Sequence, residues 1–118
     1  METPSSHLKV RRSDNVTIVS FVDRKILEEL AIQEIGEEIN RLVESEPGVR
    51  LLLDFSGVDH LSSAALGMLI TVNNRVKEQN GLLRLANINK QIFEVFKITR
   101  LNKLFSIHAT ADDALADL

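Results

Sequence analysis

The sequence contains no cysteine among its 118 residues. Disulfide bonds, thiolate metal ligands and a cysteine nucleophile are therefore excluded, which is consistent with a reducing compartment. Tryptophan and tyrosine are absent too, so only five phenylalanines could stack on nucleic-acid bases. The net charge of −3 offers no general attraction to nucleic acid or anionic lipid. We therefore expect neither nucleic acid nor a membrane as a partner.

Long apolar runs are also missing. No stretch approaches the ~18 consecutive apolar residues of a membrane span, and the N-terminal Met-Glu-Thr-Pro-Ser-Ser does not resemble a secretory signal. This predicts a cytoplasmic protein. His7, His60 and His108 are far apart, so no pair has the helical spacing of metal ligands. Because a Gly-x-x-x-x-Gly-Lys loop is absent as well, we expect no metal and no cofactor.

What the chain does contain is typical of a globular fold. Hydrophobic residues make up 44% and charged residues 26%, with only 2 Pro and 5 Gly. At roughly 100–200 residues per domain, the length predicts a single domain over residues 1–118. The polar residues 1–7 are expected to form a flexible tail.

Strand-like and helix-like patterns alternate along the chain. Strands are predicted at 8–12, 16–21, 49–55, 82–86 and 104–107, with a hairpin turn at 13–15. Helices are predicted at 25–45, from Ser62 to Asn80-Gly81, at 90–96 after Asn89, and from Thr110 onward, where Thr110 and Asp113 resemble a reciprocal capping box. Strands separated by helices imply mainly parallel pairing, with an antiparallel hairpin at one edge. The fold class is therefore α/β or α+β.

The helix at 25–45 is predicted from its amphipathic spacing. Its apolar residues recur every three or four positions: Leu27, Ala31, Ile35, Ile39 and Leu42. In the helix after Ser62, the same argument places Leu66 and Leu69 on the face that packs against the sheet.

Polar residues are densest where the strand at 49–55 passes into the next helix. Asp54, Ser56, Asp59, Ser62 and Ser63 all lie in this stretch. Ligands often bind at the C-terminal ends of such strands. The structural alternative is that Ser62 caps the helix, while the other residues end the strand and form the turn.

A serine hydrolase would use Ser63, His60 or His108, and Asp54 from the same stretch. The Gly-x-Ser-x-Gly pattern of such enzymes is absent, which argues against this possibility.

Charge is distributed unevenly. Residues 23–46 carry 3 basic and 8 acidic side chains, whereas residues 75–103 carry 7 basic and 2 acidic ones. Solvated helix faces explain most of this asymmetry, and a polarised surface would also steer a partner protein.

Two motifs resemble the STAS domain family of bacterial anti-sigma factor antagonists. The first is Leu51-Leu-Leu-Asp-Phe-Ser-Gly-Val-Asp-His-Leu-Ser-Ser-Ala-Ala-Leu-Gly-Met-Leu, an apolar strand followed by a serine pair that opens a helix. The second is Val95-Phe-Lys-Ile-Thr-Arg-Leu-Asn-Lys-Leu-Phe-Ser-Ile, followed by an acidic helix. Together they extend the resemblance over about residues 8–118.

The resemblance implies a central, mixed four- to five-stranded sheet flanked by about four helices. It also implies a non-enzymatic switch that binds an anti-sigma factor serine kinase, with ATP bound by that partner, and so releases a sigma factor for transcription. The kinase would phosphorylate Ser63. Asp23 matches an acidic residue near that position, while Ser62, Ala65 and Arg100 depart from the family's frequent Asp, Gly and Gly.

The sequence therefore favours an anti-sigma factor antagonist controlled by phosphorylation at Ser63 in a partner-switching pathway. Ser62, Asp23, Asp54, Ser56 and Asp59 would form the helix cap and the surroundings of the switch. We expect a monomer or a weak homodimer. The alternative is a STAS scaffold or sensor adaptor that binds partners without being phosphorylated.

Overall fold

The computed structural model describes residues 7–118. Most of the predicted flexible tail, residues 1–6, lies outside the described residues. The strands are β1 (Leu8–Ser13), β2 (Val16–Phe21), β3 (Lys25–Ile26), β4 (Arg50–Asp54), β5 (His60–Leu61), β6 (Leu82–Ala86) and β7 (Ser106–His108). The helices are α1 (Glu29–Ser45), α2 (Ser63–Glu78), α3 (Lys90–Ile98), the 3-10 turn η1 (Leu101–Lys103) and α4 (Ala111–Ala116).

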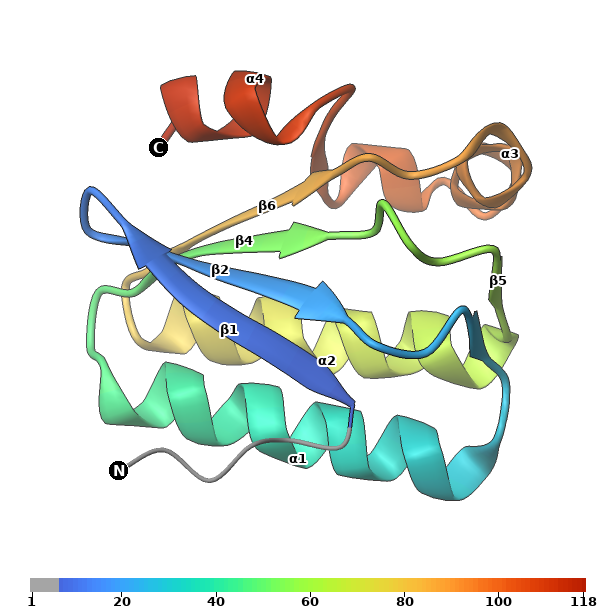
Figure 1. The fold of residues 1–118 in the computed structure, drawn as a ribbon, viewed down its shortest axis with the longest axis horizontal. Helices are drawn as coiled ribbons and strands as arrows, with labels where there is room; N and C mark the ends of the chain where they lie inside the picture. Colours follow the sequence, from blue (N-terminus) through green and yellow to red (C-terminus); the bar gives the residue numbers. More distant parts are fainter. Residues whose placement is uncertain (1–6) are drawn as a thin grey trace.

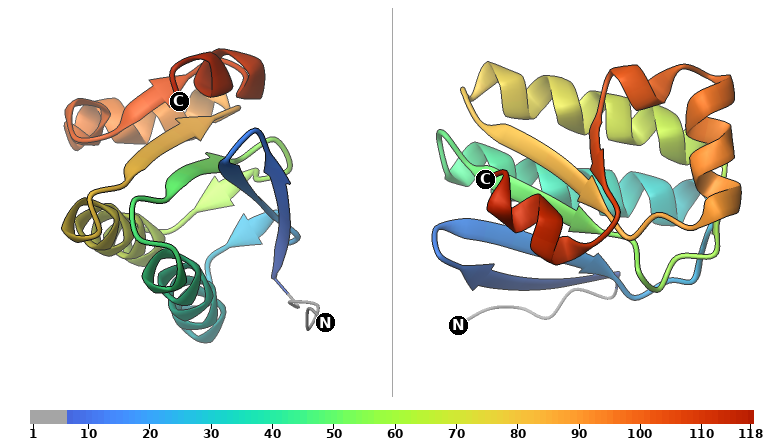
Figure 2. Two further views of the ribbon diagram at one scale, coloured as in Figure 1. Left: turned by 90° about the vertical axis from the view of Figure 1, so that its left-hand side faces the viewer. Right: turned by 90° about the horizontal axis from the view of Figure 1, so that it is seen from above.

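Five strands form one mixed sheet in the order β1-β2-β4-β6-β7, of which Figure 1 labels the first four and the left view of Figure 2 shows β7 beside β6. β1 runs antiparallel to β2, and the other neighbours are parallel. The hairpin turns at Asp14 and Asn15, whose φ angles of 48° and 69° are typical of the turn whose twist matches a β-hairpin. The predicted mixed sheet with four flanking helices and an antiparallel edge is confirmed.

The two faces of this sheet are covered unequally. α1 and α2 lie together on one face, and the short α4 lies on the other (Figure 2). The central strand β4 serves both layers, since Leu51 and Leu53 belong to the larger core while Leu52 packs toward α4. Such a doubly buried strand explains the continuous apolar run of the sequence.

The predicted start of the first helix is wrong. Lys25 and Ile26 form β3, which pairs in parallel with His60 and Leu61 of β5, and α1 begins only at Glu29. Leu27 is therefore exposed rather than part of a buried face. The buried positions of α1 are Ile32, Ile35, Gly36, Ile39 and Val43.

Asn80 and Gly81 follow the end of α2, and each is suited to its position for a different reason. Asn80 adopts the left-handed conformation, with a φ of 60°. Gly81 is required by space, because a Cβ atom there would lie 2.4 Å from the backbone oxygen of Val49. The Gly81 amide donates to Val76 O at 2.8 Å, which joins the helix end to the strand that follows.

The C-terminal part also differs from the prediction in detail. The strand expected at 104–107 is β7 at Ser106–His108, because the chain first forms the turn η1. This turn follows Arg100, which adopts the left-handed conformation with a φ of 63°. At the start of α4, the Thr110 side chain accepts from the Asp113 amide at 3.1 Å, so one half of the predicted capping box is present.

Candidate functional site

The polar cluster predicted from the sequence lies at the edge where the parallel strands end. Asp54 is the last residue of β4 and is buried. Its Oδ1 accepts from the Ser56 amide at 3.0 Å and from Asn87 Nδ2 at 2.9 Å. Asp54 and Ser56 thus form the turn after β4, and Asn87 ties that turn to the end of β6.

A second asparagine fixes the rest of this loop. Asn89 Nδ2 donates to the carbonyls of Val58 and Asp59 at 3.2 and 3.1 Å, while its Oδ1 caps α3 by accepting from the Ile92 amide at 2.8 Å. The Asp59 carboxylate accepts from Arg24 Nε at 3.1 Å, on the segment that leads into β3. The loops after β2, β4 and β6 are therefore cross-linked into one surface.

Ser62 connects this surface to α2. Its amide donates to Ile26 O at 3.1 Å, which continues the pairing of β3 with β5. Its side chain accepts from the Ala65 amide at 3.2 Å, so Ser62 is the N-cap of the helix. The predicted capping role of Ser62 is confirmed.

Ser63 is the first residue of α2, and its side chain is exposed. The helix extends from Ser63 to Glu78, and its first turn contains no acidic residue. The unpaired amides and the dipole of a helix N-terminus favour an anionic group. A hydroxyl at this position is accessible, and a negative charge added to it is compatible with the fold.

Asp23 lies on the loop after β2, and its carboxylate contacts the imidazole of His7 rather than Ser62 or Ser63. Its Oδ2 lies 2.8 Å from His7 Nδ1, and Glu34 Oε1 lies 3.4 Å from His7 Nε2. Burial of the imidazole opposes protonation, but the hydrogen bonds and charges of the two carboxylates outweigh it and raise the pKa of His7. His7 is the last residue of the predicted flexible tail, but in the structure it connects the start of β1 to Glu34 of α1.

Among residues 7–118, two side chains of the hydrolase hypothesis, Asp54 and His108, contact other groups, and Asp54 accepts from the Ser56 amide and Asn87. His108 contacts Ser106 Oγ at 3.4 Å and Asp117 Oδ2 at 3.2 Å, and both contacts use the same ring nitrogen, Nε2. A catalytic triad requires serine and carboxylate on opposite nitrogens. The Asp117 carboxylate also accepts from Arg84 Nε, and hydrogen bonding and charge from Arg84 lower the pKa of Asp117.

Three further residues, Arg24, Asn87 and Asn89, belong to this surface and were not among the predicted site residues. For the two asparagines, the sequence does contain a signal of this position: Asn-Ile-Asn directly follows the strand at 82–86. The ends of neighbouring parallel strands meet at one edge of a sheet. Arg24 carried no such signal, because it depends on the pairing of β3 with β5.

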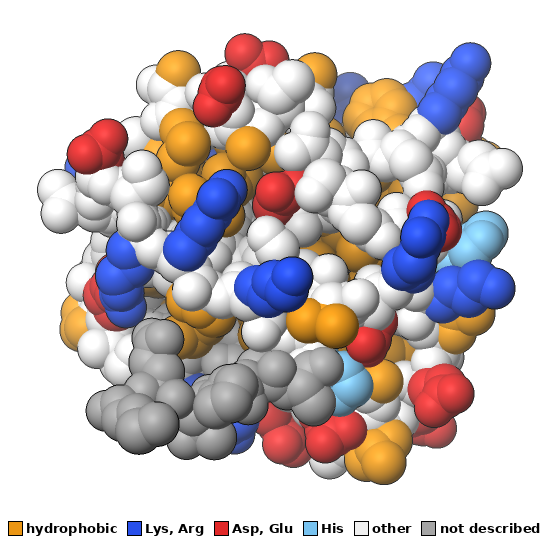
Figure 3. Space-filling view, in the orientation of Figure 1, with side chains coloured by type: hydrophobic (Ala, Val, Ile, Leu, Met, Phe, Trp, Pro, Cys, Tyr) orange, Lys and Arg blue, Asp and Glu red, His pale blue; other side chains and the backbone are white. Residues whose placement is uncertain are grey.

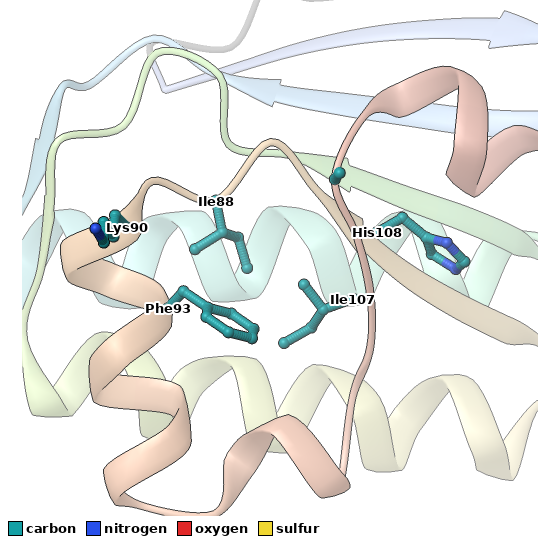
Figure 4. Close-up of a pocket in the computed structure, with 6 residues that line it drawn as sticks. Ile88, Lys90, Phe93, Ile107 and His108 are labelled. Carbon is teal, nitrogen blue, oxygen red and sulfur yellow. The ribbon is translucent and has the colours of Figure 1, made fainter.

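A separate hollow of about 400 Å³ lies beside α3. Ile88, Phe93 and Ile107 point toward one another there, while the ring of His108 points away toward α4 (Figure 4).

Of the helices in residues 7–118, none is both long and apolar enough to cross a bilayer. In the same part of the chain, no group of three or more His, Asp or Glu side chains, the His7, Asp23 and Glu34 cluster included, is arranged to hold a metal ion.

Nearly the whole described chain is similar to proteins of one known family. The family model described as "STAS domain" matches residues 7–114. The chain belongs to the STAS domain family. This STAS domain is 29% identical over 68 residues to the anti-sigma-B factor antagonist of Bacillus subtilis (strain 168), a match that covers 58% of this chain and 62% of the relative. A match to a second curated relative, from Thermotoga neapolitana, covers 61% of that protein, so the chain spans less than two thirds of the length of either relative.

Solved structures share the fold of this STAS domain. An anti-sigma-factor antagonist (STAS) domain protein from Planctomyces limnophilus superimposes with a TM-score of 0.85 and 22% identity, covering 93% of this chain and 96% of that one. The Bacillus cell fate determinant SpoIIAA in its phosphorylated form gives a TM-score of 0.69 and 14% identity, covering 93% and 97%. At these identities the structures show a common fold.

Proposed function

We propose that this STAS domain is an anti-sigma factor antagonist, a binding module that catalyses no reaction itself. It binds an anti-sigma factor and so releases a sigma factor for transcription. The anti-sigma factor is also a serine kinase, which uses its own bound ATP to phosphorylate Ser63 and end the interaction. The names of the relatives support the first step, and the geometry of the serine pair supports the second.

The observation that carries the proposal is the different environment of the two adjacent serines. The Ser62 hydroxyl oxygen is bonded to the Ala65 amide in the cap, and the residue is half-buried. Ser63 has no capping role, and its side chain is exposed. A kinase that approaches this end of α2 therefore meets the Ser63 hydroxyl.

Phosphorylation would act on partner binding and leave the fold intact. The free domain accommodates the phosphate, because the helix N-terminus favours negative charge by ~0.3–1 kcal/mol. In a complex, the same group brings about −1.5 to −2 charges into an interface shaped for a hydroxyl. Removing that charge from water without a partner group weakens binding by on the order of a hundredfold or more.

The kinase step is tested with anti-sigma factor kinases of the source organism and ATP. We expect one phosphate on Ser63 by tandem mass spectrometry, and none on the Ser63→Ala variant. The matched control is Ser62→Ala, which should lose about 1 kcal/mol of stability but remain a substrate. Phosphate on Ser62 or Ser56 would contradict the assignment.

The binding step is tested by calorimetry with the same anti-sigma factors. Unmodified protein should bind tightly, and Ser63→Glu or the phosphoprotein should bind weakly. Equal affinities would exclude a switch at Ser63. If the unmodified protein binds tightly but the kinase assay detects no phosphate, the result favours the scaffold or adaptor instead.

A further inference from the structure

Residues 27–38, which we call the acidic segment, combine exposed leucines with negative charge. The segment contains five glutamates and no basic residue. Leu27 and Leu30 are 48% and 68% exposed. On α1, Leu30 shares a face with Glu34 and Glu37 at helical spacing, opposite the buried Ile32 and Ile35 face. An exposed apolar side chain therefore shares a helix face with two glutamates, of which Glu34 also contacts His7.

Residues 95–104, which we call the basic segment, have the opposite character. They include Lys97, Arg100 and Lys103 and no acidic residue. Their exposed apolar side chains are Val95, Ile98 and Leu104, at 40%, 78% and 38%. Lys97 forms an ion pair with Glu94 at 3.3 Å, whereas for Arg100 and Lys103 no carboxylate of residues 7–118 lies within ion-pair distance.

The two segments lie in different parts of the molecule. α1 runs below the sheet in Figure 1, while α3 lies at the upper right, and the left view of Figure 2 also separates them. Figure 3 shows red and orange atoms along the lower right, over α1, and blue beside orange at the upper right, near α3. One chain therefore cannot satisfy its own basic segment with its acidic segment.

We propose that these segments bind each other between two copies of this chain, so that the domain self-associates head to tail. Charge complementarity identifies the partner, because the chain itself carries the surface that matches each segment. Each segment offers at least two exposed aliphatic side chains and charges of one sign. Exposed apolar residues surrounded by polar groups mark interaction surfaces.

The arrangement has a specific geometric consequence. Because each contact joins two different surfaces, a dimer leaves one acidic and one basic segment free, and further copies can add. An isologous dimer would instead use both surfaces at once. The contact is small and partly electrostatic, so it is weak and sensitive to ionic strength.

The test is sedimentation velocity of the purified chain alone, from about 10 µM to about 1 mM, a range suited to small interfaces. We expect the weight-average mass to rise with concentration beyond that of a dimer, and to rise less in high salt. Leu30→Lys in the acidic segment and Ile98→Gln in the basic segment should each reduce this growth strongly. Both sites are exposed, and circular dichroism verifies folding.

Matched controls place the same changes elsewhere. Asn74→Lys, on an exposed position of α2, and Val22→Gln, at an exposed aliphatic residue outside both segments, should associate like the wild type. Mixing Leu30→Lys with Ile98→Gln should form a 1:1 dimer and nothing larger, because only one intact pair of segments remains.

Several outcomes would overturn the proposal. They are a monomer at every concentration, association that survives both substitutions, loss of association in the controls, or a mixture that stays monomeric. Because no kinase or anti-sigma factor is present, these outcomes are independent of the proposed function. A failed kinase assay would in turn leave the self-association standing.

Discussion

Replacing Gly81 by alanine should disrupt the joint between α2 and β6. The new Cβ would lie 2.4 Å from Val49 O and 3.1 Å from side-chain carbons of Val49 and Val76. Because ordinary carbon–oxygen contacts are about 3.3–3.6 Å, the backbone must move by roughly 1 Å. Val49 O cannot move freely, since it accepts from the Leu82 amide at 2.8 Å at the start of β6.

The expected loss combines two effects. Overpacking of a well-packed site costs about 1–3 kcal/mol. Weakening the hydrogen bond between Leu82 and Val49 adds about 0.5–1.5 kcal/mol. Gly81→Ala should therefore lower the free energy of unfolding by roughly 1.5–4.5 kcal/mol, the sum of the two terms.

Urea unfolding followed by circular dichroism measures this value, with two other glycines as controls. At Gly67, on the exposed side of α2, an added Cβ meets nothing within 4 Å, so Gly67→Ala should stabilise by up to about 1 kcal/mol. At Gly36 the nearest atom is the flexible Met68 side chain at 2.9 Å, so the effect should be intermediate. A Gly81→Ala protein within ~0.5 kcal/mol of the wild type would refute the reasoning.

Three further substitutions test other parts of the structure. Arg100→Gly should raise the urea midpoint, with a gain of up to about 1 kcal/mol, because Arg100 holds a left-handed φ that glycine adopts without strain. The folded-state pKa of His7 is raised, so its stabilising contribution should be complete below about pH 6.5 and lost at higher pH as the imidazole deprotonates. His7→Gln should therefore flatten the pH dependence of stability measured by urea melts. Leu69→Ala should cost ~2–5 kcal/mol because Leu69 is fully buried, whereas Arg75→Ala, at an exposed ion pair, should change stability by less than ~0.5 kcal/mol in the same melts.

Elements with a local signal could be predicted from the sequence. Ser62 and Asn89 cap the helices that they precede, and the strand at 82–86 has the predicted bounds. The two caps depend on a side chain that bonds to the amide three positions ahead, and the strand depends on its own apolar run. Such local features can be predicted from neighbouring residues alone.

Features that depend on distant segments could not be predicted. β3 and β5 have two residues each, too few for a periodic pattern, and they form only because their segments meet in the fold. Leu27 fits the spacing of the helix core, but β3 delays the helix start and leaves it exposed. The bond from Asn87 to Asp54 joins residues 33 positions apart. The assignment of Ser63 as the switch stays a prediction.

The small β3–β5 sheet gives the domain a gradient of local stability. The amides of Asp59 and Ser62 are held by the carbonyls of Arg24 and Ile26, outside the five-stranded sheet. Opening these bonds, together with those from Asn89 and Arg24 to the same segment, would free the residues before α2 without separating the central strands. In hydrogen exchange, these two amides should therefore exchange through local opening, while those of β4 exchange only with global unfolding. On the proposed function, this local opening would let the end of the domain that carries Ser63 adjust to a partner while the core stays folded.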